Sequence, residues 1–218
     1  MVADRDEAHA AIDRGDVRVA GAPATNASRL VSPDEAVAVR AERSRYVGRG
    51  GEKLAAALER FGLDLTGARV LDAGSSTGGF TDCALQAGAT SVLAVDVGRG
   101  QLHQRLLTDP RVEVHERTNV RHVRPGDLGA APDVVVADLS FISLRAVAEA
   151  LLALARPGAD FVWLVKPQFE ATHDEVSEAR GVIRDPAVWR RVLSEVGGTL
   201  EGRGAAIMGL VSSPIRGA

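Results

Sequence analysis

The chain has 218 residues, of which 45% are hydrophobic and 25% are charged, and its formal net charge is −3 at pH 7. These values exclude a disordered or fibrous protein and fit one large globular domain, or a standard domain with a small appendage. No apolar stretch approaches the ~20 residues of a membrane span, and Cys83, the only cysteine, excludes an internal disulfide, so we expect a cytoplasmic protein without a span or secretion signal.

The first part of the chain predicts a small α/β module. A short helix is expected at 5–13, followed by a turn at 15–16. Alternation of valine with polar or small residues predicts two short, half-buried strands, one at 17–19 and one at 37–39. A module of about forty residues is too small to hold a generous core by itself.

A basic segment follows this module. Within fourteen residues the chain has Arg40, Arg43, Arg45, Arg49 and Lys53, interrupted by two glutamates. Because counterion release needs clustered cations and the whole chain is weakly acidic, we expect any polyanion to be bound by this segment. A solvated basic linker without a ligand is the alternative.

From residue 51 onward, short apolar runs alternate with helical segments. This pattern predicts an α/β fold, with a parallel sheet covered by helices. Strands are expected at 70–73, 91–97, 112–115, 133–139 and 161–165, and a sixth at 205–211. Helices are expected to begin soon after residue 51 and at 81–87, 101–107, 144–155 and 186–196.

The first of these strands runs into a glycine-rich loop, DAGSSTGGF, at 72–80. Its glycines allow a sharp turn and a close approach of the backbone to a ligand. The spacing is not that of a dinucleotide or phosphate loop. Asp96 ends the second strand, 22 residues after Gly74, where an acid meets ribose hydroxyls. An acid in the loop and an acid at the end of the second strand suit an adenosine that carries a cation, so the pattern predicts S-adenosylmethionine. A tight turn with a purely structural role is the alternative.

The chain has 26 basic residues but only two lysines, Lys53 and Lys166. Arginine cannot serve as a base at any working pH, so the lysines mark candidate sites for a deprotonatable amine; biased composition is the alternative. Lys166 and Asp138 end adjacent predicted strands and are expected at one crevice. An N-cap role for Asp138 and an ion pair between Lys166 and Glu170 are the structural alternatives.

These residues lie in segments that resemble the TlyA family of ribosomal RNA 2′-O-methyltransferases, many of which carry the older label haemolysin. The matching segments are SRYVGRGGEKL, LDAGSSTGGFTD, VVADLSFISL and LVKPQFE, with ERTNVR as a weaker fifth. The resemblance implies a Rossmann-like, S-adenosylmethionine-dependent methyltransferase domain of the FtsJ-like type over 45–218. It also implies that 1–44 form a partial RNA-binding α/β domain and basic linker.

The resemblance also implies roles for individual residues. The family has a Lys-Asp-Lys-Glu tetrad, whose first three members fall on Lys53, Asp138 and Lys166. The cofactor site falls on Asp72, Gly74, Ser76, Gly78, Gly79, Asp96 and Asn119. The linker arginines Arg40, Arg43, Arg45 and Arg49 are expected to hold phosphates of ribosomal RNA or of a ribosomal subunit.

This chain departs from the family pattern at both ends. The family's first helix and last strand are not matched, so we expect a shortened member. The tetrad glutamate has no counterpart, since Glu170, Glu175 and Glu178 lie in the wrong segment. We expect the strand at 205–211, without its usual neighbour, to form an exposed edge that is disordered, pairs with the fifth strand or pairs with another copy.

The expected function is methyl transfer to a ribose 2′-hydroxyl of ribosomal RNA. Lys166 is expected to take or orient the hydroxyl proton, Asp138 to position that amine, and Lys53 to act as a second cation near the ribose. The main alternative is a catalytically inactive remnant that binds RNA or cofactor. A pore-forming haemolysin and a nicotinamide dehydrogenase are disfavoured, by the lack of a span and by the loop spacing.

Overall fold

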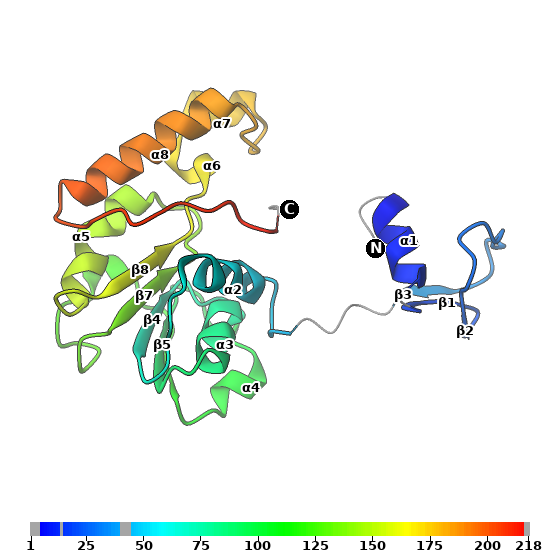
Figure 1. Cartoon of the computed structure of the whole chain (residues 1–218), viewed down its shortest axis with the longest axis horizontal. Helices are drawn as coiled ribbons and strands as arrows, with labels where there is room; N and C mark the ends of the chain where they lie inside the picture. The colour runs from blue at the N-terminus through cyan, green and yellow to red at the C-terminus, as the bar shows by residue number, and fades with distance from the viewer. Residues whose placement is uncertain (1–4, 14, 40–44, 216–218) are drawn as a thin grey trace. The chain divides into compact units, whose positions relative to one another are not determined.

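The computed structural model describes residues 5–13, 15–39 and 45–215. The chain divides into two compact units, Met1–Ser44 and Arg45–Ala218, and each is described by itself (Figure 1). Two of the linker arginines, Arg40 and Arg43, lie outside the described residues.

The amino-terminal unit is one helix beside a three-stranded antiparallel sheet in the order β2-β1-β3. Its elements are α1 (Arg5–Asp13), β1 (Val17–Val19), β2 (Ala22–Pro23) and β3 (Val37–Val39). Ala20 and Gly21 both have positive φ, as a two-residue hairpin turn of this kind requires, but alanine does not favour that conformation, so the sequence gives little sign of β2. The prediction that β3 is half-buried is wrong, because all three of its side chains are exposed.

The larger unit is built on five parallel strands in the order β6-β5-β4-β7-β8. The strands are β4 (Arg69–Ala73), β5 (Ser91–Val95), β6 (Val112–His115), β7 (Val134–Ala137) and β8 (Asp160–Trp163). The helices are α2 (Gly50–Phe61), α3 (Gly79–Gln86), α4 (Gln104–Leu107), η1 (Val120–His122), α5 (Leu144–Leu154), α6 (Pro167–Glu170), α7 (His173–Glu178) and α8 (Pro186–Glu201). The predicted parallel α/β sheet is therefore confirmed.

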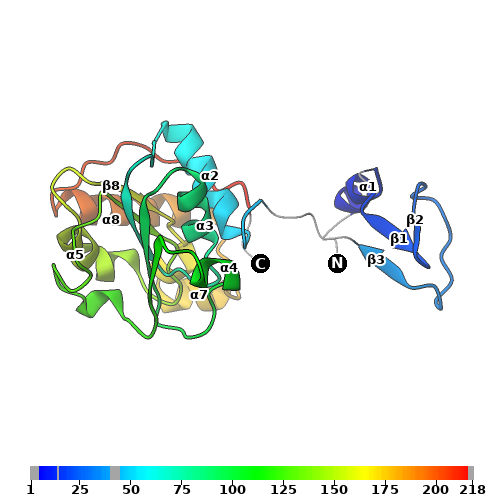
Figure 2. The same cartoon turned by 90° about the horizontal axis from the view of Figure 1, so that it is seen from below.

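Helices cover both faces of this sheet, as Figures 1 and 2 show. Side chains at alternate strand positions point to opposite faces. Val70, Val92 and Val134 pack with α2 and α3 in one core. Their neighbours Leu71, Leu93 and Val135 pack with α5 and α8 in the other. Because both faces are buried, the strands are apolar throughout, and their carboxyl ends all open on one edge.

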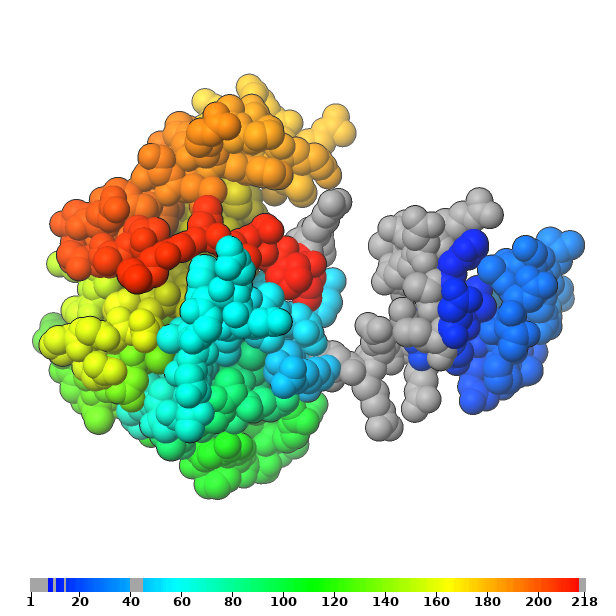
Figure 3. Space-filling view, in the orientation of Figure 1, coloured from blue at the N-terminus to red at the C-terminus, as the bar shows by residue number. Residues whose placement is uncertain are grey.

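The prediction of a strand at 205–211 is wrong. After α8 the chain continues without helix or strand and crosses toward α2, drawn in red in Figures 1 and 3. The outer edge of β8 pairs with no other strand among the described residues, and a groove of about 890 Å³ separates it from residues 205–209. A strand needs a neighbour for its backbone hydrogen bonds. Without one in register, Met208 and Leu210 remain 90% and 67% exposed.

Candidate active site

The glycine-rich loop after β4 makes close backbone contacts that side chains would block. Gly74 has a φ of +86°, and a Cβ there would lie 3.0 Å from the carbonyl oxygen of Asp138. Gly78 has a φ of +95°, and a Cβ there would lie 2.1 Å from a methyl group of Leu106. The loop therefore turns sharply at the carboxyl end of the sheet while it packs against the next loop and α4.

Asp96, just after β5, connects this loop to a cavity. Its two carboxylate oxygens accept hydrogen bonds from the backbone N–H groups of Ser76, at 2.8 Å, and Gly98, at 2.7 Å. The cavity has a volume of about 580 Å³, within the range of small-molecule sites. Its lining includes Gly74, Ser76, Asp96, Asn119, Leu139 and Ile142. The structure thus brings four of the predicted cofactor residues to one cavity.

The other predicted cofactor residues lie elsewhere. Asp72 is fully buried beneath the loop, where it accepts a hydrogen bond of 2.6 Å from the Thr81 hydroxyl. Burial raises the pKa of Asp72 to about 7. Gly78 packs against Leu106, and Gly79 lines a second, smaller pocket. These residues hold the loop in place.

That second pocket contains both lysines of the chain. Asp138 lies between them: Lys53 Nζ is 2.9 Å from Asp138 Oδ2, and Lys166 Nζ is 2.6 Å from Asp138 Oδ1. The three side chains are 16–21% exposed. Lys166 also donates a hydrogen bond of 2.8 Å to the Ser140 hydroxyl. Residues 85 and 28 positions apart therefore meet at one carboxylate. The places of Asp138 and Lys166 after adjacent strands predicted their meeting, whereas Lys53 comes from helix α2.

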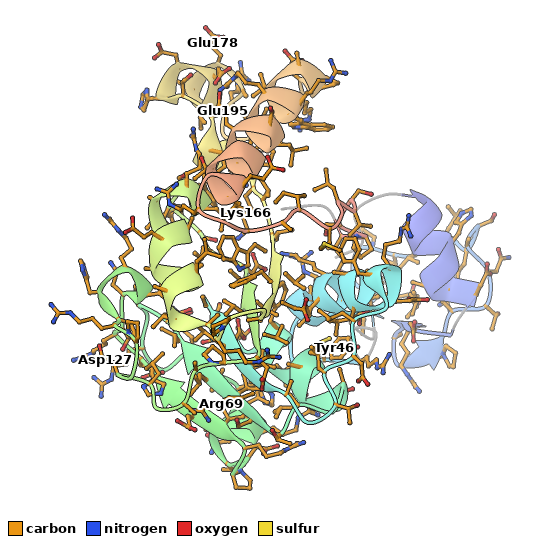
Figure 4. The ribbon with its side chains drawn as sticks, turned by 60° about the vertical axis from the view of Figure 1, so that its left-hand side comes forward. Tyr46, Arg69, Asp127, Lys166, Glu178 and Glu195 are labelled. Atoms are coloured by element: carbon orange, nitrogen blue, oxygen red, sulfur yellow. The ribbon has the colours of Figure 1, made fainter. Side chains whose placement is uncertain are left out.

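Glycine contacts between two helices bring Lys53 to this place. A Cβ at Gly79, the first residue of α3, would lie 2.8 Å from the backbone nitrogen of Gly51 in α2. The buried Tyr46 ring covers Gly51 from another side, and burial raises the pKa of Tyr46 to about 12. Buried Asp82 of α3 accepts a 2.8 Å hydrogen bond from the backbone of Val47 and so fixes the chain before α2. Figure 4 shows Tyr46 beside this helix.

Lys166 is held differently, and here both structural alternatives are wrong. Glu170 does not pair with Lys166; its carboxylate accepts from Arg145 and from the amino end of α5. Asp138 does not cap α5 either, because Ser143 does so. Lys166 itself is the N-cap residue of the one-turn helix α6, between β8 and that helix.

The pocket that holds the lysines adjoins the larger cavity. It has a volume of about 310 Å³, and both spaces are lined by Gly74, Ser76, Asp138 and Ser140. Arg49 also lines it, so the pocket is lined by three cationic side chains and by the carboxylate of Asp138. No group of three or more potential metal ligands occurs among residues 5–13, 15–39 and 45–215. The arrangement can therefore bind an anionic or hydroxylated substrate beside a ligand in the larger cavity.

The sequence interpretation missed an aromatic pair at the mouth of the site. Phe141 is 92% exposed and has a φ of +62°, which is rare for an aromatic residue. Its ring lies 5.3 Å from that of Phe169, and Lys166 Nζ lies 5.7 Å from the Phe169 ring centre. Both phenylalanines and Ser140 stand in the segments VVADLSFISL and LVKPQFE, so close attention to the residues after each strand would have found them.

Similar proteins share this architecture. A structure of a Streptococcus thermophilus protein described as a hemolysin has a TM-score of 0.79 and 36% identity, covering 98% of this chain and 78% of that one. Hemolysin A of Brachyspira hyodysenteriae is 35% identical over 215 residues, which are 98% of this chain and 89% of that protein. The described residues contain no helix that is long and apolar enough to cross a membrane.

A further relative carries a specific enzyme name. The 16S/23S rRNA (cytidine-2′-O)-methyltransferase TlyA of Mycobacterium tuberculosis is 44% identical over all 218 residues of this chain, which span 81% of that protein. The FtsJ-like methyltransferase family matches residues 46–218, which include the cavity, both lysines and Asp138. This match, together with the 44% sequence identity to TlyA over all 218 residues of this chain, shows that the chain belongs to the FtsJ-like methyltransferase family.

Proposed function

We propose that this protein transfers a methyl group from S-adenosylmethionine to a ribose 2′-hydroxyl of ribosomal RNA. The observation that carries the proposal is the placement of Asp138 between Lys53 and Lys166, at the point where two cavities join. One cavity suits an adenosine-containing cofactor, and the other presents amines to a hydroxyl group. The relatives named as rRNA 2′-O-methyltransferases support the choice of substrate.

The residues of the larger cavity fit S-adenosylmethionine. Gly74 leaves room where a Cβ would crowd the Asp138 backbone, so a ligand can approach the loop closely. The Asp96 oxygens each accept one backbone N–H and keep a further lone pair for a ribose hydroxyl. Val97, 69% exposed, offers an apolar surface next to them for a nucleobase. When bound, the cofactor supplies a methyl group that is attached to a positively charged sulfur. The sulfur leaving group does not need an acid to protonate it.

The protein must then align the hydroxyl and receive its proton. We assign the alignment to Lys166 and Ser140, whose polar atoms lie 2.8 Å apart at the junction of the two cavities. Lys166 takes or orients the proton, and Asp138, 2.6 Å away, holds the amine and stabilises its charged form. Lys53, on the other carboxylate oxygen, fixes Asp138 and places a second cation near the ribose.

The entrance of the pocket suits a nucleotide. Arg49 adds a cation for a neighbouring phosphate, since its side chain is exposed and lines the pocket. The exposed ring of Phe141 offers a face on which an unstacked base can lie, as single-stranded RNA recognition commonly requires. Arg45, which is also exposed, extends the basic surface back toward the linker. The amino-terminal unit is assigned to RNA binding by resemblance.

The test is transfer of labelled methyl groups from S-adenosylmethionine to unmodified ribosomal RNA, offered free and in assembled subunits. We expect the label at a ribose, recognised because a 2′-O-methyl group blocks alkaline cleavage of the adjoining phosphodiester. Asp138→Asn is the matched control and should bind cofactor but transfer no methyl. Cofactor binding without transfer to either form of RNA would contradict the proposal and favour a binding protein without turnover.

A further inference from the structure

Glu170 is a buried carboxylate that the proposed mechanism does not use. It is the last residue of α6, and its side chain is 1% exposed. Glu170 Oε1 accepts from the backbone N–H of Leu144 at 2.6 Å, and Oε2 accepts from the Ser143 hydroxyl at 2.6 Å and from Arg145 Nε at 3.2 Å. Arg145 also donates to the Glu170 carbonyl oxygen at 2.7 Å. A buried carboxylate with this many donors is tightly fixed.

Together with the contacts of Lys166, these contacts join two segments of the chain at both of their ends. The two segments form a closed ring, which includes Asp138 and Lys166. One side of the ring is the segment from Asp138 to Ser143, between β7 and α5. The other side is the segment from Lys166 to Glu170, between β8 and the end of α6. Lys166 joins the two sides at the pocket through Asp138, and Glu170 joins them again at the first turn of α5.

The contact of Lys166 with Asp138 and the contact of Glu170 with the first turn of α5 differ in whether they change during the reaction. The contact of Lys166 with Asp138 and Ser140 must change while a substrate hydroxyl enters and its proton moves. Lys166 therefore needs a second constraint that takes no part in the chemistry. The Glu170 junction supplies it, since its donors are backbone and side-chain groups at a helix start, where a negative charge is also favoured by the helix dipole.

We propose that Glu170 is a positioning residue for methyl transfer: it fixes the loop of Asp138 against the segment of Lys166, so that the amine and carboxylate meet in the productive geometry. The inference rests on the proposed function. Small errors in alignment are costly in such a reaction, and a shift of about 1 Å can lower a rate by roughly 100-fold. Loss of Glu170 should thus slow the chemical step more than it weakens cofactor binding.

The same arginine offers a matched control. Arg145 Nη1 donates to Glu195 of α8 at 2.9 Å, whereas its Nε and Nη2 donate to Glu170. The Glu195 side chain is 35% exposed, and it also pairs with Arg191. Figure 4 shows Glu195 on α8 and Lys166 below that helix. Removing the Glu195 charge disturbs the ion pairs of Arg145 without removing a contact to the segment from Asp138 to Ser143. Glu195→Gln therefore separates the effect of losing an ion pair of Arg145 from the effect of moving that segment.

The experiment measures single-turnover methylation of ribosomal RNA by the full chain, with enzyme in excess over RNA, for the parent, Glu170→Ala, Glu170→Gln and Glu195→Gln. Cofactor affinity and the number of cofactor sites are titrated on each preparation. We expect Glu170→Ala to lower the rate constant by at least about ten-fold, with Glu170→Gln between it and the parent because the amide keeps one acceptor oxygen. Glu195→Gln should stay within about two-fold, since a partly exposed ion pair contributes little.

A purely structural role gives a different result. It reduces the reacting fraction, which appears in the amplitude and in the number of cofactor sites, and leaves the rate constant unchanged. An unchanged rate constant in the Glu170 variants, or an equal loss in Glu195→Gln, would overturn the inference. If Glu170→Ala does not fold, Glu170→Gln is judged by the same criterion. A parent without any methylation contradicts the proposed function instead, so the two failures are distinguishable.

Discussion

Asp138 is the residue at which the two halves of the proposed chemistry meet, because its two oxygens contact two amines from different parts of the chain. The pocket leaves 18% of the Lys166 side chain exposed and places Ser140 and Asp138 within 2.8 Å of its nitrogen. A planar guanidinium has no room to keep both contacts and does not release its proton. Charge alone is therefore insufficient at this position.

We accordingly expect Lys166→Arg to lower methylation by at least about 100-fold, the lower end of the range for a single acid–base group, while cofactor affinity stays near that of the parent. The measurement is a methyl-transfer time course together with a calorimetric cofactor titration. Asp96→Ala is the reciprocal variant and should weaken cofactor binding by about 1–3 kcal/mol through unpaired ribose hydroxyls. Activity of Lys166→Arg within a few-fold of the parent would remove Lys166 from the proton-handling role.

The buried carboxyl group of Asp72 makes the stability of the fold depend on pH. Burial raises its pKa from 3.8 to about 7, so the folded chain holds a proton there that the unfolded chain releases. Its contribution to stability is fully present below pH 3.8 and is lost as the pH rises through 7. We expect Asp72→Asn, which cannot ionise, to gain stability over the parent as the pH rises, by up to about 4 kcal/mol at pH 8.

Urea unfolding at pH 5 and pH 8 checks this expectation. Asp64→Asn is the control with the opposite sign, because hydrogen bonds from Thr66 lower the pKa of the exposed Asp64. That variant should lose a little stability at pH 8 and gain none. A gain for Asp72→Asn that is the same at both pH values would show that the effect is packing and not ionisation.

At the scale of elements, the packing of Tyr46 against the first turn of α2 depends on the absence of a side chain at Gly51. A Cβ at Gly51 would lie 2.2 Å from the Tyr46 ring. We expect Gly51→Ala to cost about 1–3 kcal/mol through overpacking and to lower methylation, since Lys53 is two residues further along the same helix. Gly197→Ala is the control: it is also helical but has nothing within 4 Å, and should stabilise the chain by roughly 0.5–1 kcal/mol.

Thermal unfolding and methylation of both variants test this comparison. Equal changes in stability for the two alanines would mean that helix propensity alone, and not the contact with Tyr46, explains the effect. Unchanged methylation in Gly51→Ala would mean that Lys53 can reach Asp138 from a displaced α2.

The sequence predicted those elements whose signal is a buried apolar pattern. The strands near Val70, Val92 and Val134 and the long helices α5 and α8 have it because both faces of the sheet are covered. The short helices α6 and α7 were missed, since one or two turns give too little periodicity. The segment 205–211 has the apolar residues of a strand, but pairing depends on a neighbour, which a local pattern does not encode.

In the candidate site, too, the sequence predicts some features and does not predict others. Asp138, Lys166 and Asp96 were predicted because they follow strands, and parallel strands place their carboxyl ends together. The ion pair between Lys166 and Glu170, which spacing along the chain offered as the structural alternative, is not formed, because the fold brings Arg145 and the start of α5 to Glu170. Partner choice between charged groups depends on packing that sequence spacing does not show.

At the scale of the whole molecule, an acidic chain must bind a polyanion through a local basic surface. Arg45 and Arg49 are the described members of that surface. We expect Arg49→Gln to weaken RNA binding and to reduce the slope of log K against log salt by about 0.7–0.9, the value of one phosphate contact. Filter binding across salt concentrations measures the slope, with the exposed Arg203→Gln as control. Equal slopes for the parent and Arg49→Gln would place the phosphates elsewhere.

The near absence of lysine has a consequence for chemical labelling. Both ε-amines of the chain lie in the same pocket, on either side of Asp138, while its other basic side chains are guanidiniums or imidazoles. A reagent that acylates amines but spares guanidinium therefore has only the α-amino group and two pocket amines to modify. Acylation of a side-chain amine in this protein is then a direct count of accessible active sites, and a bound ligand should protect that amine while leaving the α-amino group reactive.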